Sequence, residues 1–91
     1  MNRNKLRKIT RKFNRYRAPE CCAKTLKNDE EKLIILFTGT SISSCCFDEH
    51  FEDYRIMLKE EGNYKIEEII GGGNFFVVVY RKLPDGVCNP L

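Results

Sequence analysis

The residues whose type and spacing most clearly suggest a chemical role are basic side chains near the start of this 91-residue chain. Residues 1–17 contain eight of them and no acidic residue. They are Arg3, Lys5, Arg7, Lys8, Arg11, Lys12, Arg15 and Arg17. Cations without acidic neighbours can neutralise the phosphates of a nucleic acid and release the counterions held there. Residues 1–17, called the basic arm below, are therefore our predicted nucleic-acid contact, with RNA favoured over DNA.

Two aromatic residues lie among these cations. Phe13 and Tyr16 alternate with Arg15 and Arg17, and an aromatic ring beside arginine can stack on unpaired bases. The chain contains no pattern typical of a helix-turn-helix, a zinc finger or the paired aromatic motifs of an RNA-recognition domain. We therefore expect binding through phosphate contacts and RNA shape. The alternatives are a solvated helix face that keeps the protein soluble, and docking on a membrane surface or another protein.

A second group of chemically capable residues consists of cysteines and the single histidine. Adjacent cysteines begin one predicted strand and follow the next, and His50 lies one helical turn further on. A hairpin that pairs Lys27 with Lys32 would place Cys22 opposite Phe37 and bring both cysteine pairs to one end of the sheet. The predicted thiol or metal site comprises Cys22, Cys45, Cys46 and His50. Zinc or an iron–sulfur cluster is the cofactor that such residues would hold.

This site has a structural alternative. Adjacent cysteines differ from the C-x-x-C spacing of common metal sites, and half-buried cysteines often act as small hydrophobic residues. His50 lies near an apolar helix face, where histidine is commonly a packed core residue. Sequence proximity alone does not create a nucleophile–base pair. We therefore predict no catalytic residues and a non-enzymatic binding module.

The length allows one domain with a small core. Residues 18–91 hold the other eight basic side chains and all thirteen acidic ones, so a basic arm precedes an acidic body with a formal charge of −5. Such asymmetry suggests a polyanionic partner. We divide the chain into the arm and a domain over 18–91.

Hydrophobic periodicity places the elements. Leu6, Ile9, Phe13 and Tyr16 form the stripe of an amphipathic helix that ends before Pro19. The remaining pattern predicts strands over 21–26, 32–38, 64–70 and 75–80, a helix over 45–61 that ends at Gly62, and hairpin turns over 27–31 and 71–74.

The resulting fold class is α+β, with a basic N-terminal helix followed by ββαββ. Strands 32–38 and 75–80 are apolar throughout, which is typical of central strands. The expected sheet is antiparallel with the order 1-2-4-3, and the helix packs on one face. Because one helix cannot cover both faces, the arm or a second subunit would cover the other. A homodimer formed through the sheet is therefore a further hypothesis.

The stretch 33–70, with its apolar strand, Gly39, Cys45, helix and second strand, resembles the C-terminal domain of NifU-type iron–sulfur scaffold proteins. The resemblance implies iron–sulfur cluster chemistry near Cys45, although the C-x-x-C pair of that family is missing here. Residues 16–20 and 51–53 also resemble segments of small uncharacterised archaeal proteins, a likeness that implies no function.

Cellular location is inferred from what the sequence lacks. No segment approaches the roughly 20 apolar residues that span a bilayer, and residues 1–17 lack the apolar stretch of a signal peptide. A mitochondrial transit peptide is the alternative, because the arm is rich in arginine. The odd cysteine count favours a reduced, cytoplasmic protein.

Overall fold

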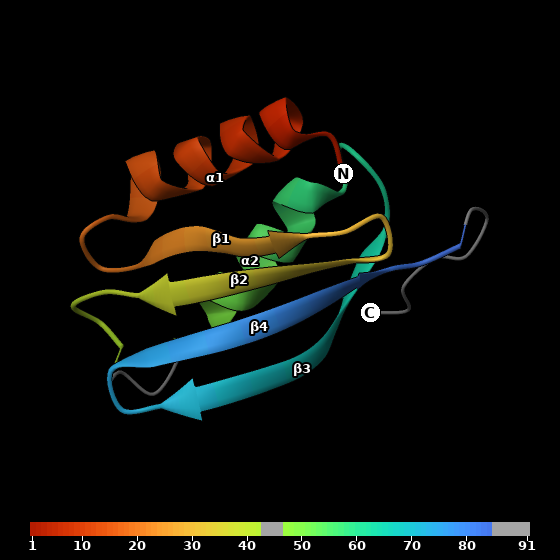
Figure 1. The fold of residues 1–91 in the computed structure, drawn as a ribbon. Coiled ribbons are helices and arrows are strands. Elements are labelled where there is room, and N and C mark those ends of the chain that lie inside the picture. The colour runs from red at the N-terminus through yellow and green to blue at the C-terminus, as the bar shows by residue number, and fades with distance from the viewer. Residues whose placement is uncertain (43–46, 85–91) are drawn as a thin grey trace.

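Two helix–strand–strand units follow each other along the chain (Figure 1). A computed structural model of the protein describes residues 1–42 and 47–84. The first unit contains helix α1 (Arg3–Arg17) and strands β1 (Cys22–Asn28) and β2 (Lys32–Thr38), and the second contains helix α2 (Glu49–Leu58) and strands β3 (Tyr64–Gly72) and β4 (Phe75–Lys82). The strands form one antiparallel sheet in the order β1-β2-β4-β3. The predicted α+β class and strand order are confirmed.

Helix α1 begins and ends where its sequence provides signals. The Asn2 side chain accepts hydrogen bonds from the backbone nitrogens of Asn4 (2.8 Å) and Lys5 (3.3 Å), which caps the first turn. At the other end, the Ala18-Pro19 peptide bond is cis, and Ala18 is extended. Proline lacks the backbone N–H that a helix needs and disfavours helical geometry in the preceding residue, so the helix ends there.

Three of the four predicted stripe residues are buried, namely Leu6, Ile9 and Phe13. Tyr16 is 71% exposed, so its assignment to the stripe was wrong. In the last turn, Arg17 takes the side nearest the core. Its guanidinium carbon lies 4.6 Å from the centre of the Phe13 ring.

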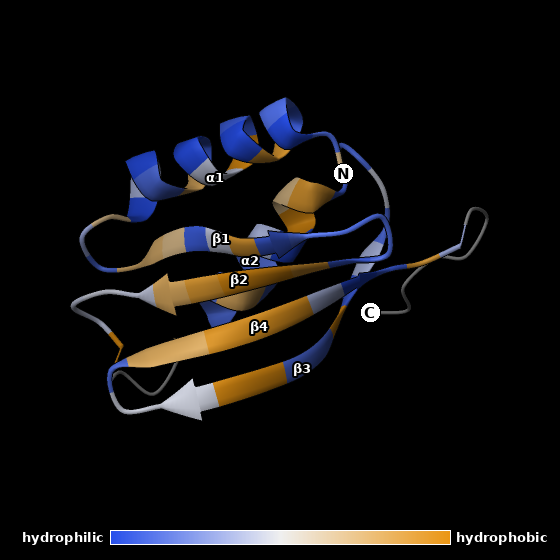
Figure 2. Ribbon diagram, in the orientation of Figure 1, coloured by the Kyte–Doolittle hydropathy of each residue, from blue (hydrophilic) through white to orange (hydrophobic). Residues whose placement is uncertain are grey.

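Both helices pack on the same face of the sheet. The Phe13 ring of α1 lies with its centre 5.9 Å from the Phe37 ring of β2 and 5.3 Å from the Tyr54 ring of α2. Helix α1 packs against β1, whereas α2 packs against β3. The arm therefore shares the core of the domain (Figure 2). The expectation that it covers the opposite face was wrong.

The width of the sheet explains why both helices pack on the same face. Four strands spaced at about 4.8 Å make a sheet wider than the roughly 10 Å diameter of one helix. Helix α2 packs against β3 and reaches across to Phe37 of β2, and α1 packs against β1 beside it. Burying an apolar side chain contributes about 2 kcal/mol, so the three buried residues of α1 dock it more strongly than surface ion pairs, which contribute at most about 1 kcal/mol each.

Both hairpins differ from the prediction, the first in its register and the second in the length of its turn. An irregularity between Thr25 and Lys27 leaves Leu26 as an extra residue, so Lys27 pairs with Ile34 and Cys22 with Thr38. The expected opposition of Cys22 and Phe37 was therefore wrong. In the second hairpin, β3 extends through Gly72. The turn is confined to Gly73 and Asn74 and is narrower than the expected 71–74.

Helix α2 is shorter than the predicted span of 45–61. Its first two predicted residues lie outside the described ranges, and the described helix begins at Glu49. At its end, the backbone nitrogens of Lys59 and Glu61 donate to the carbonyls of Ile56 and Leu58, respectively. These bonds span three residues and tighten the last turn, so the α-helix ends before Gly62 is reached.

Arg55 of α2 is a buried cation with one partner. Its side chain is 1% exposed and its Nε donates to Glu52 Oε2 at 2.8 Å. Both terminal guanidinium nitrogens lack a hydrogen-bond partner among the described residues. Burying a charge with unsatisfied donors costs free energy.

We predict that Arg55→Met raises the free energy of unfolding by about 1–2 kcal/mol, because an apolar side chain of similar length replaces an incompletely paired charge. Chemical denaturation measures this change. Glu52→Gln should have the opposite effect, and the double variant should resemble Arg55→Met. A less stable Arg55→Met protein would show that the guanidinium stabilises the fold.

Alkaline pH should unfold the protein through its buried phenols. Burial raises the pKa of Tyr54 from 10.0 to about 12 and also raises the pKa of Tyr80. The fold therefore holds the neutral phenols, and this stability is complete below pH 10 and disappears as pH rises towards 12. Ionisation of Tyr54 lowers stability by about 1.4 kcal/mol per pH unit within that window, and Tyr80 acts in the same direction. Denaturation of Tyr54→Phe across this range should show a shallower loss, and an unchanged slope would contradict the assignment.

Candidate nucleic-acid interface

The eight basic residues of the arm all lie on α1, and seven of them are exposed. Two of them form ion pairs with described residues. Lys5 Nζ lies 3.1 Å from Glu61 Oε1, and an Arg17 terminal nitrogen lies 3.2 Å from Asp53 Oδ2. These two pairs help to hold α1 beside α2. The other six cations have no ion-pair partner among the described residues and are Arg3, Arg7, Lys8, Arg11, Lys12 and Arg15.

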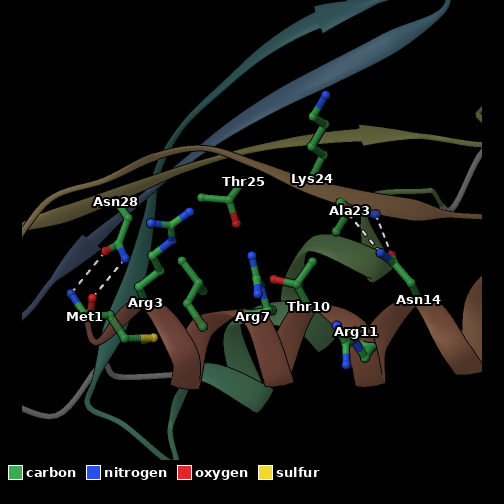
Figure 3. A pocket seen from close by; sticks show the side chains of 11 residues that line it. Met1, Arg3, Arg7, Thr10, Arg11, Asn14, Ala23, Lys24, Thr25 and Asn28 are labelled. Atoms are coloured by element: carbon green, nitrogen blue, oxygen red, sulfur yellow. Dashed lines mark hydrogen bonds between the residues drawn. The ribbon is translucent and has the colours of Figure 1, made fainter.

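A groove with a volume of about 900 Å³ lies between α1 and β1 (Figure 3). Arg3, Arg7 and Arg11 line it from the helix, and none of its lining residues is acidic. Spacing of four residues repeats along one side of an α-helix with a rise of about 6 Å per step. Arg3 and Arg7 extend from α1 towards β1, whereas Thr25 points from β1 towards α1. We call this feature the arginine groove.

Two asparagines connect the two sides of the groove by hydrogen bonds. At one end, Asn14 Oδ1 accepts from the Ala23 backbone nitrogen at 2.7 Å, and its Nδ2 donates to the Ala23 carbonyl at 3.0 Å. At the other end, Asn28 Nδ2 donates to the Met1 carbonyl at 2.8 Å, and the Met1 nitrogen donates to Asn28 Oδ1 at 3.1 Å. Because α1 is tied to β1 near both ends, the groove arginines start from fixed backbone positions.

Our sequence prediction missed these polar residues. Asn14 interrupts the cations of a helix at the border of its apolar stripe, where asparagine is a poor helix former. That position was the available signal, but its partner on β1 depends on the tertiary fold. Thr10 is a similar case, because its hydroxyl lies 2.7 Å from the Tyr54 hydroxyl of α2.

A smaller hollow of about 240 Å³ lies on the outer side of α1. Lys8, Lys12 and Arg15 line it together with Arg11 and Tyr16. The exposed Tyr16 ring is thus surrounded by cations. Phe13, the other predicted stacking residue, is fully buried and belongs to the core. Of the two predicted aromatic contacts, only Tyr16 is accessible to a base.

The structure does not bring together the described members of the predicted thiol or metal site. Cys21 and Ala23 are both buried in the core beneath the helices, so the half-exposed Cys22 between them faces the other side of the sheet. His50 packs on the helix side, with its ring centre 5.1 Å from that of Phe47.

Cys45 and Cys46 lie outside the described residues, and so does the Gly39–Cys45 loop beyond Ile42. Among residues 1–42 and 47–84, no group of three or more histidine, cysteine or acidic side chains is placed to hold a metal ion. The zinc or iron–sulfur site stays a prediction.

No family model, curated protein or solved structure matches the chain. The resemblance to the NifU-type C-terminal domain therefore also stays a prediction. Within the described part of the chain, no helix is both long and apolar enough to cross a membrane.

Cys21 should be an unreactive thiol. Burial is the main cause that raises its pKa from 9.0 to about 12, the nearby Cys22 adds to the shift, and Arg17 opposes it. Since the thiolate is the nucleophile, we expect iodoacetamide to alkylate Cys21 at pH 8 at least roughly 100-fold more slowly than Cys22. Tandem mass spectrometry can follow both sites in the folded protein, and urea-unfolded protein is the control in which the rates converge. Equal rates in the folded state would contradict the burial of Cys21.

Proposed function

We propose that this protein is a non-enzymatic module that binds RNA through the exposed cations of α1. The observation that carries the proposal is the arrangement of six cations without described ion-pair partners over α1, three of which line the acid-free arginine groove. Phosphates attract such a surface from a distance, and binding releases condensed counterions. The two basic residues paired with acids, Lys5 and Arg17, contribute less.

The repeat of the groove arginines suits a phosphate chain. Arg3, Arg7 and Arg11 succeed one another with a rise of about 6 Å, which is comparable to the separation of neighbouring phosphates along one strand. A guanidinium can donate two parallel hydrogen bonds to one phosphate. We infer that one strand follows the groove side of α1 and that successive phosphates bind successive arginines.

One feature favours RNA over a DNA duplex. The cations of α1 do not distinguish the two, because arginine and lysine contact the phosphates of both and also read guanine in the major groove of DNA. Tyr16 is exposed among Lys12 and Arg15, which provides a surface on which an unpaired base can stack. Unpaired bases are the usual targets of proteins that recognise RNA. The expected ligand is therefore single-stranded or looped RNA, bound with little sequence preference.

Replacement of the groove cations should weaken RNA binding. For the triple variant Arg3→Gln, Arg7→Gln, Arg11→Gln, we expect at least a tenfold loss of affinity for a single-stranded RNA oligonucleotide. The slope of log affinity against log salt should fall by about 2, because each lost phosphate contact removes about 0.7. Fluorescence anisotropy at several salt concentrations measures both quantities.

The matched control removes the same charge elsewhere. Lys59, Lys65 and Lys82 are exposed and belong to other parts of the fold than α1, and their replacement by glutamine should change the affinity less than threefold. Tyr16→Ala should weaken binding to single-stranded RNA more than to duplex RNA. If the groove variant and the control lost affinity equally, net charge rather than the groove would explain the binding. Wild-type protein without affinity for RNA at low salt would refute the proposal.

A further inference from the structure

Strand β1 lies at the edge of the sheet, and its free edge faces the arginine groove. The sheet order places β2 on one side of β1 and no strand of the described residues on the other. Asn14 reaches that other side from α1, because both of its hydrogen bonds join the backbone of Ala23. The backbone N–H and C=O of Ala23 therefore point away from β2 and towards the helix.

The same geometry turns the backbone of Thr25 towards the groove. In an antiparallel pair, residues whose backbone groups point to the partner strand alternate with residues whose groups point away. Thr25 pairs with Ile35 two positions after Ala23, and the irregularity of β1 comes only after Thr25. The N–H and C=O of Thr25 therefore also point away from β2. Since Thr25 lines the arginine groove, these two groups belong to its wall.

Thr10 leaves space in front of this wall. Four helical residues rise about 6 Å, and two strand residues advance about 6.6 Å. Because α1 and β1 run in opposite directions (Figure 1), the residue four before Asn14, which is Thr10, lies opposite Thr25. The Thr10 side chain is shorter than asparagine, and its hydroxyl contacts the Tyr54 hydroxyl at 2.7 Å instead. Among the described residues, no side chain caps Thr25 in the way that Asn14 caps Ala23.

We propose that the arginine groove holds one unpaired guanine base of the bound RNA against the backbone of Thr25. This inference rests on the proposed function and adds a base preference at one position. The Asn14 amide shows what the edge of β1 accepts, because its oxygen accepts from a backbone N–H at 2.7 Å and its nitrogen donates to the C=O of the same residue at 3.0 Å. Guanine presents the same acceptor and donor side by side, as O6 and N1–H. Guanine O6 accepts from the Thr25 N–H, and guanine N1–H donates to the Thr25 carbonyl.

The groove arginines select guanine among the four RNA bases. Uracil also has an amide-like edge, but guanine adds a second acceptor, N7, beside O6, and one arginine binds both acceptors with two parallel hydrogen bonds. Adenine and cytosine present an amino group at this position, to which arginine cannot donate. Arg7 is exposed and extends from α1 towards β1 within the groove, so we assign this contact to Arg7. Its guanidinium has five N–H donors, which allows it to bind the base and still donate to a phosphate.

The groove also has the size and lining that a base requires. Its volume of about 900 Å³ lies within the range of roughly 300–1,000 Å³ that is usual for ligand sites. The buried side chains of Leu6 and Ala23 form an apolar part of the lining, against which the ring can pack. The phosphate contacts are the same for every sequence, so guanine adds its preference to a binding energy that all RNA shares.

Fluorescence anisotropy with short oligouridine RNA tests the inference on the full chain. One central uridine is replaced by guanosine, adenosine or cytidine, and all affinities are measured at the same salt concentration. We expect guanosine to raise the affinity at least roughly fivefold over the other three bases. The analogues 7-deazaguanosine, which lacks N7, and N1-methylguanosine, which lacks the N1–H, should each lose most of this gain. Equal affinity for all four RNAs would overturn the inference and leave the proposed function intact, whereas absence of binding to any of them would overturn both.

A variant that keeps the charge of the groove tests the role of Arg7. Arg7→Lys retains the positive charge but loses the two parallel hydrogen bonds. The affinity for the guanosine-containing RNA should therefore fall to that for plain oligouridine, and the affinity for plain oligouridine should change less than about twofold. Arg15→Lys, on an exposed residue of α1 that does not line the groove, is the matched control and should keep the guanosine preference. Equal loss of preference in both variants would contradict the assignment to Arg7.

Thr25→Pro tests the edge of β1, because proline has no backbone N–H. This N–H points away from β2, so proline removes no hydrogen bond of the sheet. The guanosine preference should disappear in Thr25→Pro and persist in Thr25→Val, which keeps the N–H. Circular dichroism establishes whether the proline variant is folded, and the base analogues and Arg7→Lys decide the question if it is not. Free guanosine monophosphate that competes as strongly as the guanosine-containing RNA would assign the groove to a nucleotide and overturn the inference.

Discussion

The aromatic contact of Phe13 with Phe37 and Tyr54 is the interaction on which the rest of the structure depends. These rings come from α1, β2 and α2, and their centres lie 5.3–5.9 Å from one another. They join the two helix–strand–strand units into one core. Once Phe13 is buried, the rotation of α1 about its axis is fixed. The direction of every cation on the helix follows from that rotation, including the row that lines the arginine groove.

The packing of α1 on the core means that the basic arm is an ordered surface of the domain and not a separate tail. A disordered basic tail would lose conformational entropy on binding a polyanion. Helix α1 has already lost that entropy, because Leu6, Ile9 and Phe13 are buried and Asn14 ties the helix to the edge strand. A preorganised cationic surface loses less freedom when it binds. Because α1 is packed on the core, its cations cannot extend far from the domain, so the ligand must approach α1 on its solvent side.

The sequence was sufficient for the elements and the sheet order because both depend on local hydrophobic pattern. The apolar runs of β2 and β4 identified the central strands, and their buried centres confirm that interpretation. The predictions that were wrong depend on one extra residue in a strand or on a tertiary contact. Leu26 shifts the register at Cys22 without any change in composition that marks a bulge. Tyr16 continues the helical period of the stripe, yet Arg17 takes the inner position because Phe13 and Asp53 are there to receive it. The candidate site was likewise predictable as a set of cations, whereas the groove required the position of β1.

The placement of both helices on one face follows from the width of the sheet and has a consequence for the other face. A four-stranded sheet with apolar central strands needs cover on both sides, since β2 and β4 carry valine, leucine and isoleucine at consecutive positions. Burial of α1 with α2 covers one side, and no element of the described residues covers the other. On that second side Ile34, Leu36 and Val77 are half-buried and Val79 is buried. The same choice of face therefore positions the arginine groove and leaves the apolar residues Ile34, Leu36 and Val77 on the side of the sheet opposite both helices.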